Sequence, residues 1–247
     1  MFVTEMPNKN IHKKGFSPEP PEGCDLSKER ILLHCCCAPC STAIIEWMVG
    51  VGLRPGIFFS NSNIVPFREY SIRRDELIRY AAAHGLETID DEYDHAAWLT
   101  FVRRLETSPV AEPVVWQAHE PVIRIADMPE RGPRCLECFK FRLLRAARCA
   151  AANGYTLLTT TLASSRWKDL EQVDTAGCWA CDVVNGACDN ESVADLDSEP
   201  LLSGRNKVLW WNQNWRRGGL QERRNALIKE WNMYNQTFCG CEFSERH

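Results

Sequence analysis

The chain has 247 residues, of which 45% are hydrophobic and 25% are charged, and its formal net charge is −4. This composition is that of a globular protein and excludes a coiled coil, a collagen-like repeat and a chain disordered throughout. No apolar run reaches the roughly 18 residues that a membrane span needs, and the N-terminus lacks the apolar segment of a secretory signal. We therefore expect a cytoplasmic protein without a membrane partner.

Apolar runs in the first half of the chain predict strands that alternate with helices. Residues 1–29 carry lysines and prolines without apolar periodicity and are expected to form a flexible tail before a single domain, 30–247. The run Ile-Leu-Leu-His-Cys at 31–35 predicts a buried strand, and Ser41 or Thr42 is expected to cap the next helix. Further elements are expected at 54–59 (strand), 68–84 (helix, ending at Gly85) and 86–89 (strand).

Two intervals interrupt this pattern in the second half. Residues 107–133 are rich in proline, and residues 176–205 are acidic and rich in turn-forming residues, so both are expected to be loop insertions. Between and after them we expect helices at 138–153 and 220–231 and strands at 155–161 and 208–211. Strands alternating with helices predict an α/β fold with a mainly parallel sheet covered on both faces, a three-layer α/β/α arrangement.

The 13 cysteines are the unusual feature of the composition, and they are clustered. Without an export signal they are expected in a reducing compartment, where cysteines more often serve metals or redox chemistry than structural disulfides. The groups are Cys24 with the run Cys35, Cys36, Cys37 and Cys40 at the end of the first strand; Cys135 and Cys138, with Cys149 apart from them; Cys178, Cys181 and Cys188; and Cys239 and Cys241.

The first cysteine group falls where parallel α/β sheets place their sites, beyond the carboxyl end of a strand. Adjacent thiolates repel one another unless a cation, a cluster or another partner is present. The C-x-x-C pair before the helix expected at 138–153 can turn both sulfurs toward one point. Together the two groups suit a cysteine-ligated iron–sulfur cluster or a cysteine-rich zinc site. Structural zinc and unligated thiols remain the alternatives.

The pair Cys239-Gly240-Cys241 follows a different logic. A disulfide across one intervening residue closes a small, strained ring, and strained disulfides tend to be reducible and therefore catalytic or regulatory. The alternative is a further pair of ligands, or idle thiols near a chain end.

Six sequence blocks in order carry a family resemblance: LLHCCCAPCST, FFSNSNIVPFREYSIRRDEL, DDEYDHAAW, PERGPRCLECFKFRL, TTTLASSRWKD and YNQTFCGCEFS. Over most of residues 31–175 and 207–244 the chain resembles the QueH type of epoxyqueuosine reductase. The resemblance implies a Rossmann-like α/β/α fold of the HUP kind. It also implies reduction of the epoxide of epoxyqueuosine in tRNA to queuosine, the last step of queuosine biosynthesis, with a [4Fe-4S] cluster and a redox-active cysteine pair.

The resemblance also implies roles for individual cysteines. Cys36 and Cys37 match the first pair of cluster ligands, Cys135 and Cys138 match the second, and Cys239 and Cys241 match the redox-active pair. Cys40 matches a position that is Cys or Asp in relatives, which makes it a candidate ligand of an additional mononuclear iron or zinc, or a substrate contact. Departures from the family pattern are Cys35, where relatives have an aliphatic residue, the length of 107–128 and 176–205, and Cys178, Cys181 and Cys188.

The expected reaction also limits the cofactors. Removing an epoxide oxygen to leave an alkene consumes two electrons and two protons, and iron–sulfur clusters reach potentials as low as about −700 mV. No G-x-G-x-x-G follows the first strand, so a nicotinamide or flavin is not expected there. Cysteines stand where ATP-using relatives of the fold carry a phosphate loop, which argues against ATP. No motif identifies the electron donor.

Other residues have two interpretations each. His34 is a candidate proton donor to the epoxide oxygen, or a satisfied core histidine. Asn61, Asn63, Tyr70, Ser164 and Lys168 are candidates for contact with the nucleoside or a phosphate, and loop capping is the alternative for the two asparagines. Arginines 68, 73, 74, 79, 216, 217, 223 and 224 could form a tRNA-facing patch or an ion-paired, solvated surface. Trp210, Trp211 and Trp215 could stack on unpaired anticodon-loop bases or lie in the core.

Two other classes of function remain open at this point. One is a zinc-stabilised RNA-binding protein without catalysis. The other is a thiol–disulfide oxidoreductase that uses the C-x-x-C or the C-x-C pair directly. Iron with acid-labile sulfide, stoichiometric zinc or no metal in the purified protein would distinguish the three.

Overall fold

The computed structural model describes residues 18–106, 124–187 and 207–244. Five parallel strands form one sheet in the order β3-β2-β1-β4-β5. Their bounds are β1 Ile31–His34, β2 Gly56–Phe59, β3 Thr88–Asp90, β4 Leu157–Thr160 and β5 Leu209–Trp210. Every residue of β1, β2 and β4 is buried, as expected for strands covered on both faces, which read as continuous apolar runs.

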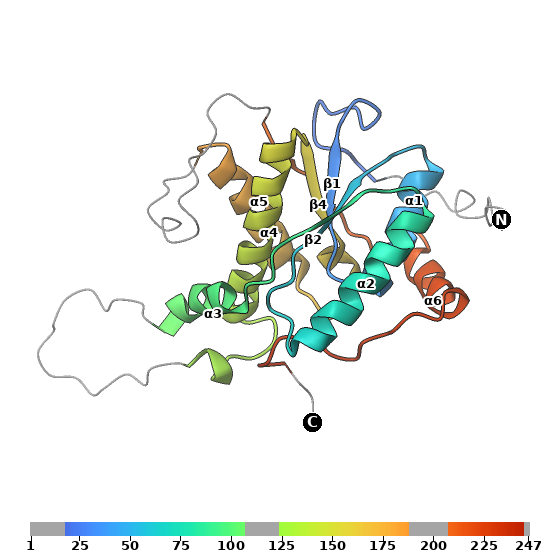
Figure 1. Cartoon of the computed structure of the whole chain (residues 1–247). Coiled ribbons are helices and arrows are strands. Elements are labelled where there is room, and N and C mark those ends of the chain that lie inside the picture. The colour runs from blue at the N-terminus through green and yellow to red at the C-terminus, as the bar shows by residue number, and fades with distance from the viewer. Residues whose placement is uncertain (1–17, 107–123, 188–206, 245–247) are drawn as a thin grey trace, which may run out of the picture.

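Helices cover both faces of the sheet (Figure 1). Helices α1, α2 and α6 pack together on one face, and α3, α4 and α5 pack on the other. Their bounds are α1 Ala38–Gly50, α2 Phe67–Ala83, α3 His95–Arg103, α4 Pro133–Asn153, α5 Leu170–Val184 and α6 Leu220–Glu230. Short 3₁₀ turns lie at Arg104–Glu106, Ile125–Asp127 and Thr161–Ser164. The predicted three-layer α/β/α fold with a parallel sheet is confirmed.

Two helices begin earlier than the sequence predicts. Helix α1 begins at Ala38, with Pro39 in its first turn, and the Ser41 hydroxyl donates to the Cys37 carbonyl at 2.7 Å instead of capping the helix. Helix α4 begins at Pro133, because proline suits the first turn, where its missing N–H is not needed. Cys135 and Cys138 therefore lie within the first two turns of α4 and not before it.

Helix α5 was not predicted, and it replaces the start of an expected insertion. The Asp169 carboxylate caps it by accepting the backbone N–H groups of Glu171 at 2.9 Å and Gln172 at 3.1 Å. Residues 176–184 are thus helical. Within the expected insertion 176–205, the structure also describes residues 185–187, and residues 188–205 lie outside the described part. Of the interval 107–133, residues 107–123 lie outside the described residues. An Asp94 cap likewise begins α3, which was also missed.

The segment expected to be an N-terminal tail is described from residue 18 onward. The Glu19 carbonyl accepts the Trp211 indole N–H at 2.9 Å and the Gln213 amide at 2.8 Å. Residues 18–29 therefore lie against the domain, whereas residues 1–17 fall outside the described part. In the described chain, the helices are too short or too polar to span a membrane.

Helix α5 packs closely on the edge of the sheet because its residue 177 lacks a side chain. A Cβ at Gly177 would lie 2.2 Å from the Trp210 ring, whose indole N–H donates to Asp174 of the same helix at 2.6 Å. Such an overlap requires the Trp210 ring or the whole helix to move, because a rigid indole ring cannot shift aside as the end of a flexible side chain can.

We expect Gly177→Ala to destabilise the protein by about 2 kcal/mol net. Overlap with a buried ring lies at the upper end of overpacking costs, about 3 kcal/mol, and alanine regains roughly 1 kcal/mol over glycine inside a helix. Urea unfolding measures the change, with Thr175→Ala on the exposed side of the same helix as the matched control. Equal stability of the Gly177→Ala and wild-type proteins would contradict the close packing of α5 on Trp210.

Candidate metal and redox site

The predicted cysteines gather at the carboxyl edge of the sheet. Strand β1 ends at His34 and leads through Cys35–Cys37 into α1, and β2 leads into a buried polar loop, Ser60–Asn63. Strand β4 leads into the turn Thr161–Ser164. Since parallel strands end on the same side, these three connections meet, as the topology rule for such sheets requires.

Three of the cysteines form a compact cluster, here called the three-cysteine group: Cys36, Cys37 and Cys40. Their sulfur atoms all lie within 4.8 Å of one another, with 3.9 Å between Cys36 and Cys37. The Thr161 hydroxyl donates to the Cys36 sulfur at 3.4 Å, and the Gln236 amide donates to the Cys37 sulfur at 2.7 Å. Three sulfurs at this spacing match the ligand set of a single metal ion with an open coordination position.

The protonation of this group is uneven. Hydrogen bonds from Cys37 and Cys40 lower the pKa of Cys36 well below its usual value. Burial raises the pKa of Cys37, and the bond to Cys36 raises that of Cys40 to about 12. One thiolate held by two thiols is the expected metal-free state, and a bound cation would favour deprotonation of the others.

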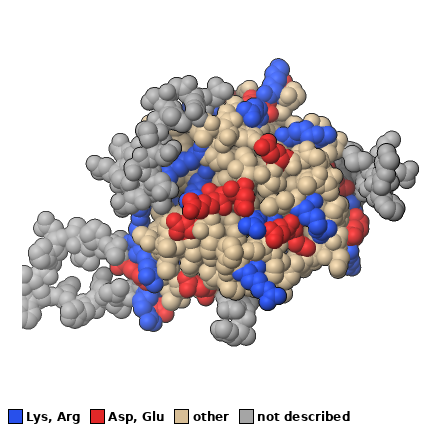
Figure 2. Space-filling model, viewed as in Figure 1, with Lys and Arg blue, Asp and Glu red and all other residues tan. Residues whose placement is uncertain are grey.

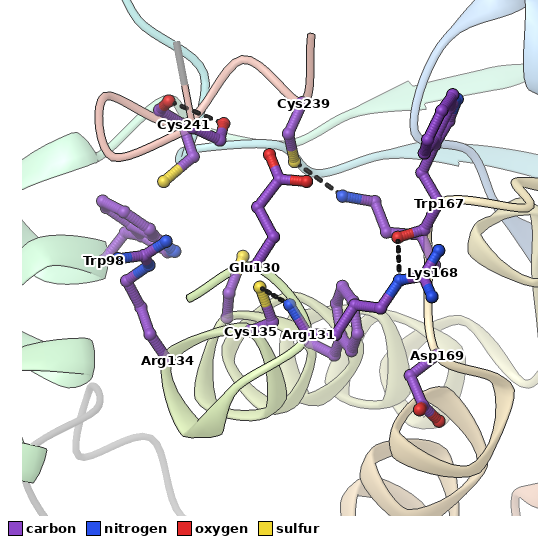
Figure 3. A pocket seen from close by; sticks show the side chains of 13 residues that line it. Trp98, Glu130, Arg131, Arg134, Cys135, Trp167, Lys168, Asp169, Cys239 and Cys241 are labelled. Atoms are coloured by element: carbon purple, nitrogen blue, oxygen red, sulfur yellow. Dashed lines mark hydrogen bonds between the residues drawn. The ribbon is translucent and has the colours of Figure 1, made fainter. Parts of the chain in front are cut away.

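Four further cysteines, here called the four-cysteine group, line a small cavity: Cys135, Cys138, Cys239 and Cys241. Figure 3 shows Cys135, on α4, facing Cys239 and Cys241 on the C-terminal segment, with Trp98 and Arg134 on one side and Lys168 on the other. Burial raises the pKa of Cys135, Cys138 and Cys241. These thiols are therefore neutral unless a metal holds them.

Cys239 is the exception in this group. Burial opposes its charged form, but the Lys168 ammonium lies 2.7 Å from its sulfur and lowers the pKa of the thiol. The effect acts in both directions. Burial alone would lower the pKa of Lys168, but the attraction of the Cys239 thiolate is larger and raises it. The structure therefore holds a thiolate–ammonium pair between the cavities.

The C-terminal segment is held in place by contacts of its backbone. The Arg73 guanidinium, paired with Glu69 at 2.6 Å, donates to the Cys239 carbonyl at 2.9 Å. The Gly240 carbonyl accepts the Val65 N–H at 2.9 Å. Gly240 has φ +99°, a conformation that side chains disfavour, so glycine is required between the two cysteines.

The two cavities adjoin each other. The three-cysteine group lines a larger, more open cavity, together with Asn63 and Gln236. Four residues line both cavities: Glu130, Trp167, Lys168 and Cys239. The described contacts thus divide the predicted cysteines differently from the sequence-based grouping, since Cys135 and Cys138 lie with Cys239 and Cys241 and not with Cys36 and Cys37.

The remaining cysteines that the structure describes lie elsewhere. Cys35 is fully buried in the core, and burial raises its pKa. Cys178 and Cys181 lie on α5, exposed and buried respectively, and neither lines the two cavities. Cys188 falls outside the described residues.

His34 is a core histidine by its contacts. It is fully buried, its Nε2–H donates to the Ser60 carbonyl at 3.1 Å, and its Nδ1 therefore accepts from the Thr160 hydroxyl at 2.7 Å. Burial, helped by the Arg142 charge, lowers its pKa to about 3. Both ring nitrogens of His34 are engaged in hydrogen bonds, and the residue lines neither of the two cavities. These contacts favour a structural role for His34 over the role of proton donor.

Three of the four α2 arginines of the candidate tRNA-facing patch form ion pairs. Arg73 is buried against Glu69, Arg74 pairs with Asp75 and Asp90, and Arg79 lies 3.6 Å from Glu76. The face in Figure 2 shows Lys and Arg intermixed with Asp and Glu. Trp211 and Trp215 are buried and pack on each other, and Trp210 is half-buried beside α5, so these three tryptophans are core residues.

Several site residues were not singled out from the sequence. Arg142 is buried and donates to the Ser60 carbonyl and the Asn61 side chain. Its position four residues after Cys138 on α4, and hence on the same helix face, was an available signal. Glu130, Trp98, Trp167 and Gln236 stand in the sequence blocks that carry the family resemblance or directly beside them, but no spacing rule marks them.

Fold and site together define a parallel three-layer α/β protein whose carboxyl edge carries thiols clustered as in metal-binding oxidoreductases. The family described as "Epoxyqueuosine reductase QueH" matches residues 31–113, 110–187 and 190–247. The chain belongs to this family, and the predicted resemblance is confirmed.

Relatives named epoxyqueuosine reductase QueH support the same conclusion. Those of Histophilus somni and Haemophilus influenzae are 35% and 34% identical over 217 residues, which is 88% of this chain and 72% of each relative. That of Acinetobacter baylyi is 33% identical over 218 residues, 88% of this chain and 81% of the relative.

We expect His34→Gln to flatten the acid dependence of stability. The folded protein keeps His34 neutral down to about pH 3, whereas the unfolded chain binds a proton below the usual pKa of 6.5. Wild-type stability therefore falls as the pH drops from 6.5 toward 3, by about 1.4 kcal/mol per pH unit from this residue. Urea unfolding at several pH values measures it, and parallel curves for the two proteins would refute the assignment.

Proposed function

We propose that this chain reduces the epoxide of epoxyqueuosine in tRNA to the alkene of queuosine, the final step in making that nucleoside. The observation that carries the proposal is the meeting of seven thiols in two adjoining cavities at the carboxyl edge, in a chain of the QueH family. A tRNA substrate is consistent with reaction in the cytoplasm.

The four-cysteine group supports a [4Fe-4S] cluster as the cofactor, since such clusters are held by four thiolates. The cavity also offers donors for cluster sulfur. The buried Trp98 indole N–H lies against the Cys138 thiol and opposes the burial that raises its pKa, and the Lys168 ammonium already contacts Cys239. The three-cysteine group would then hold the additional mononuclear iron or zinc, with Cys40 as one ligand.

This assignment differs from the one that the resemblance implies, in which Cys36, Cys37, Cys135 and Cys138 hold the cluster and Cys239 and Cys241 cycle as a redox pair. That ligand set would have to span both cavities. What supports the revised set is the shared cavity of its four sulfurs and the thiolate that Lys168 stabilises at Cys239.

The reaction balances as one epoxide, two electrons and two protons giving one alkene and one water. A bound iron–sulfur cluster would supply low-potential electrons, delivered by a donor that the chain does not identify. The larger cavity would receive the nucleoside, and its Asn63 and Gln236 side-chain oxygens, buried without hydrogen-bond partners, would accept bonds from substrate N–H or O–H groups. Lys168, at the boundary of the two cavities, would donate a proton to the departing oxygen.

The two alternative functions are less well supported. A zinc-stabilised RNA-binding protein needs no boundary ammonium between two thiol-lined cavities. A thiol–disulfide oxidoreductase acting directly needs an exposed pair, whereas Cys138 and Cys241 are buried. Neither nicotinamide nor ATP chemistry is proposed, because cysteines occupy the turn after β1.

Anaerobically purified protein, given a chemical reductant and tRNA carrying epoxyqueuosine, should form queuosine, detected as the loss of one oxygen by nucleoside mass spectrometry. Lys168→Met should keep its iron and lower turnover by roughly 100-fold, because general acid catalysis contributes about that much. Lys168→Arg is the charge-retaining control. A colourless zinc protein without turnover would contradict the proposed function.

Serine substitutions separate the two ligand assignments. We expect Cys135→Ser, Cys138→Ser, Cys239→Ser and Cys241→Ser to lose iron and acid-labile sulfide together. The same change in the three-cysteine group should leave the sulfide unchanged and remove at most the single iron. Cys178→Ser, on the exposed side of α5, is the control. Sulfide retained in Cys239→Ser and Cys241→Ser but lost in Cys36→Ser would restore the redox-pair assignment.

A further inference from the structure

Trp167 is an aromatic side chain on the rim of the site. It is 53% exposed, whereas Trp98, Trp211 and Trp215 are at most 1% exposed, and the other tryptophans that the structure describes are buried or half-buried. It lines both cavities. An exposed large aromatic at a cavity mouth contributes little to the core and is a candidate for ligand contact.

The turn that carries Trp167 is fixed by two arginines. Arg131 donates to the Trp167 carbonyl at 3.2 Å and to the Arg166 carbonyl at 3.0 Å. Arg216 donates to the Ser165 and Lys168 carbonyls at 2.5 and 2.6 Å. The indole is therefore held at the rim through its backbone, which reduces the ordering cost when a ligand covers it.

The position of the ring relates it to the substrate cavity. Its neighbour Lys168 reaches Cys239 at the boundary of the cavities, whereas in Figure 3 the indole extends away from Cys135 on the far side of Lys168. A ligand with one group inside the cavity would thus place an adjoining group over the indole.

The surroundings of the ring favour nucleic acid. The Arg166 guanidinium lies 5.3 Å from the ring centre, Arg131 is exposed nearby, and Arg224 lines the larger cavity. Glu130 and Asp169 are the acidic residues of the smaller cavity, and the Asp169 carboxylate is engaged in capping α5. Aromatic platforms flanked by cations bind unpaired bases and their phosphates.

We propose that Trp167 is a base-stacking platform for the RNA substrate, taking an unpaired base next to the nucleoside whose modified ring enters the larger cavity. This inference rests on the proposed function and deepens it. It transfers the stacking role from Trp210, Trp211 and Trp215, which are core residues, to a tryptophan at the site itself.

The test measures binding of a labelled anticodon stem–loop carrying epoxyqueuosine, without reductant, so that affinity is read separately from turnover. We expect Trp167→Ala to raise Kd about tenfold or more, as loss of one base–aromatic stack does, and Trp167→Phe to raise it much less. Phe67→Ala removes a similarly exposed aromatic, 55% exposed and outside both cavity linings, and should bind as the wild type does. Iron content should be the same in all four proteins.

A second RNA identifies the contact. Two further stem–loops lack the base on the 5′ or the 3′ side of the modified nucleoside. We expect one of them to bind the wild-type protein more weakly, and that same RNA to bind Trp167→Ala as tightly as the intact stem–loop does. Equal stem–loop affinity of Trp167→Ala and wild type would overturn the inference. It would also be overturned if Trp167→Ala lost as much affinity for the isolated nucleoside as for the stem–loop, because Trp167 would then be part of the cavity wall. Unchanged RNA affinity with slower reduction by a protein donor would assign the rim to that donor. Wild-type protein that binds no stem–loop would instead refute the proposed function.

Discussion

The Arg142 guanidinium is buried where α4 meets the ends of β1 and β2, and its charge acts on thiols of both cysteine groups. Its hydrogen-bond acceptors, the Ser60 carbonyl and the Asn61 side chain, are neutral. A buried charge without compensation costs several kcal/mol, so the nearby thiolates are its counter-ions. Its charge adds to the hydrogen bonds that lower the pKa of Cys36 and opposes burial at Cys138 and Cys239. It also adds to the burial that keeps His34 neutral.

The sequence predicts well those parts of the fold in which burial alone determines the residue types. Strands β1 and β2 contain apolar runs because both of their faces are covered, and β4 combines two leucines with two β-branched threonines. Helix α5 escapes prediction because small residues, Ala176, Gly177 and Ala180, interrupt its buried face, so the sequence lacks the stripe of large apolar residues that marks a helix. Only such residues let the helix approach Trp210, so the signal depends on a partner that is distant in sequence.

The candidate site shows the same division. The spacing of the cysteines and the end of β1 predict that thiols from distant stretches meet at the carboxyl edge of the sheet. Their grouping depends on how the C-terminal segment returns across α2, and Arg73 and Val65 fix that path through backbone contacts of Cys239 and Gly240. Backbone contacts leave no side-chain pattern to read. His34 and the α2 arginines were ambiguous for a related reason, since only the positions of their partners separate a core or paired residue from a reactive one.

The seven site thiols come from three stretches of chain, 36–40, 135–138 and 239–241, and no stretch supplies more than three of them. In small zinc domains the ligands nucleate the fold, and the metal-free chain is unfolded. Here the sulfurs meet only after the sheet has formed, so a metal would be loaded after folding. The nascent chain would offer an ion only partial coordination, and the finished site would decide which metal stays. Exchange of a wrong ion would then leave the scaffold standing, ready to be loaded again.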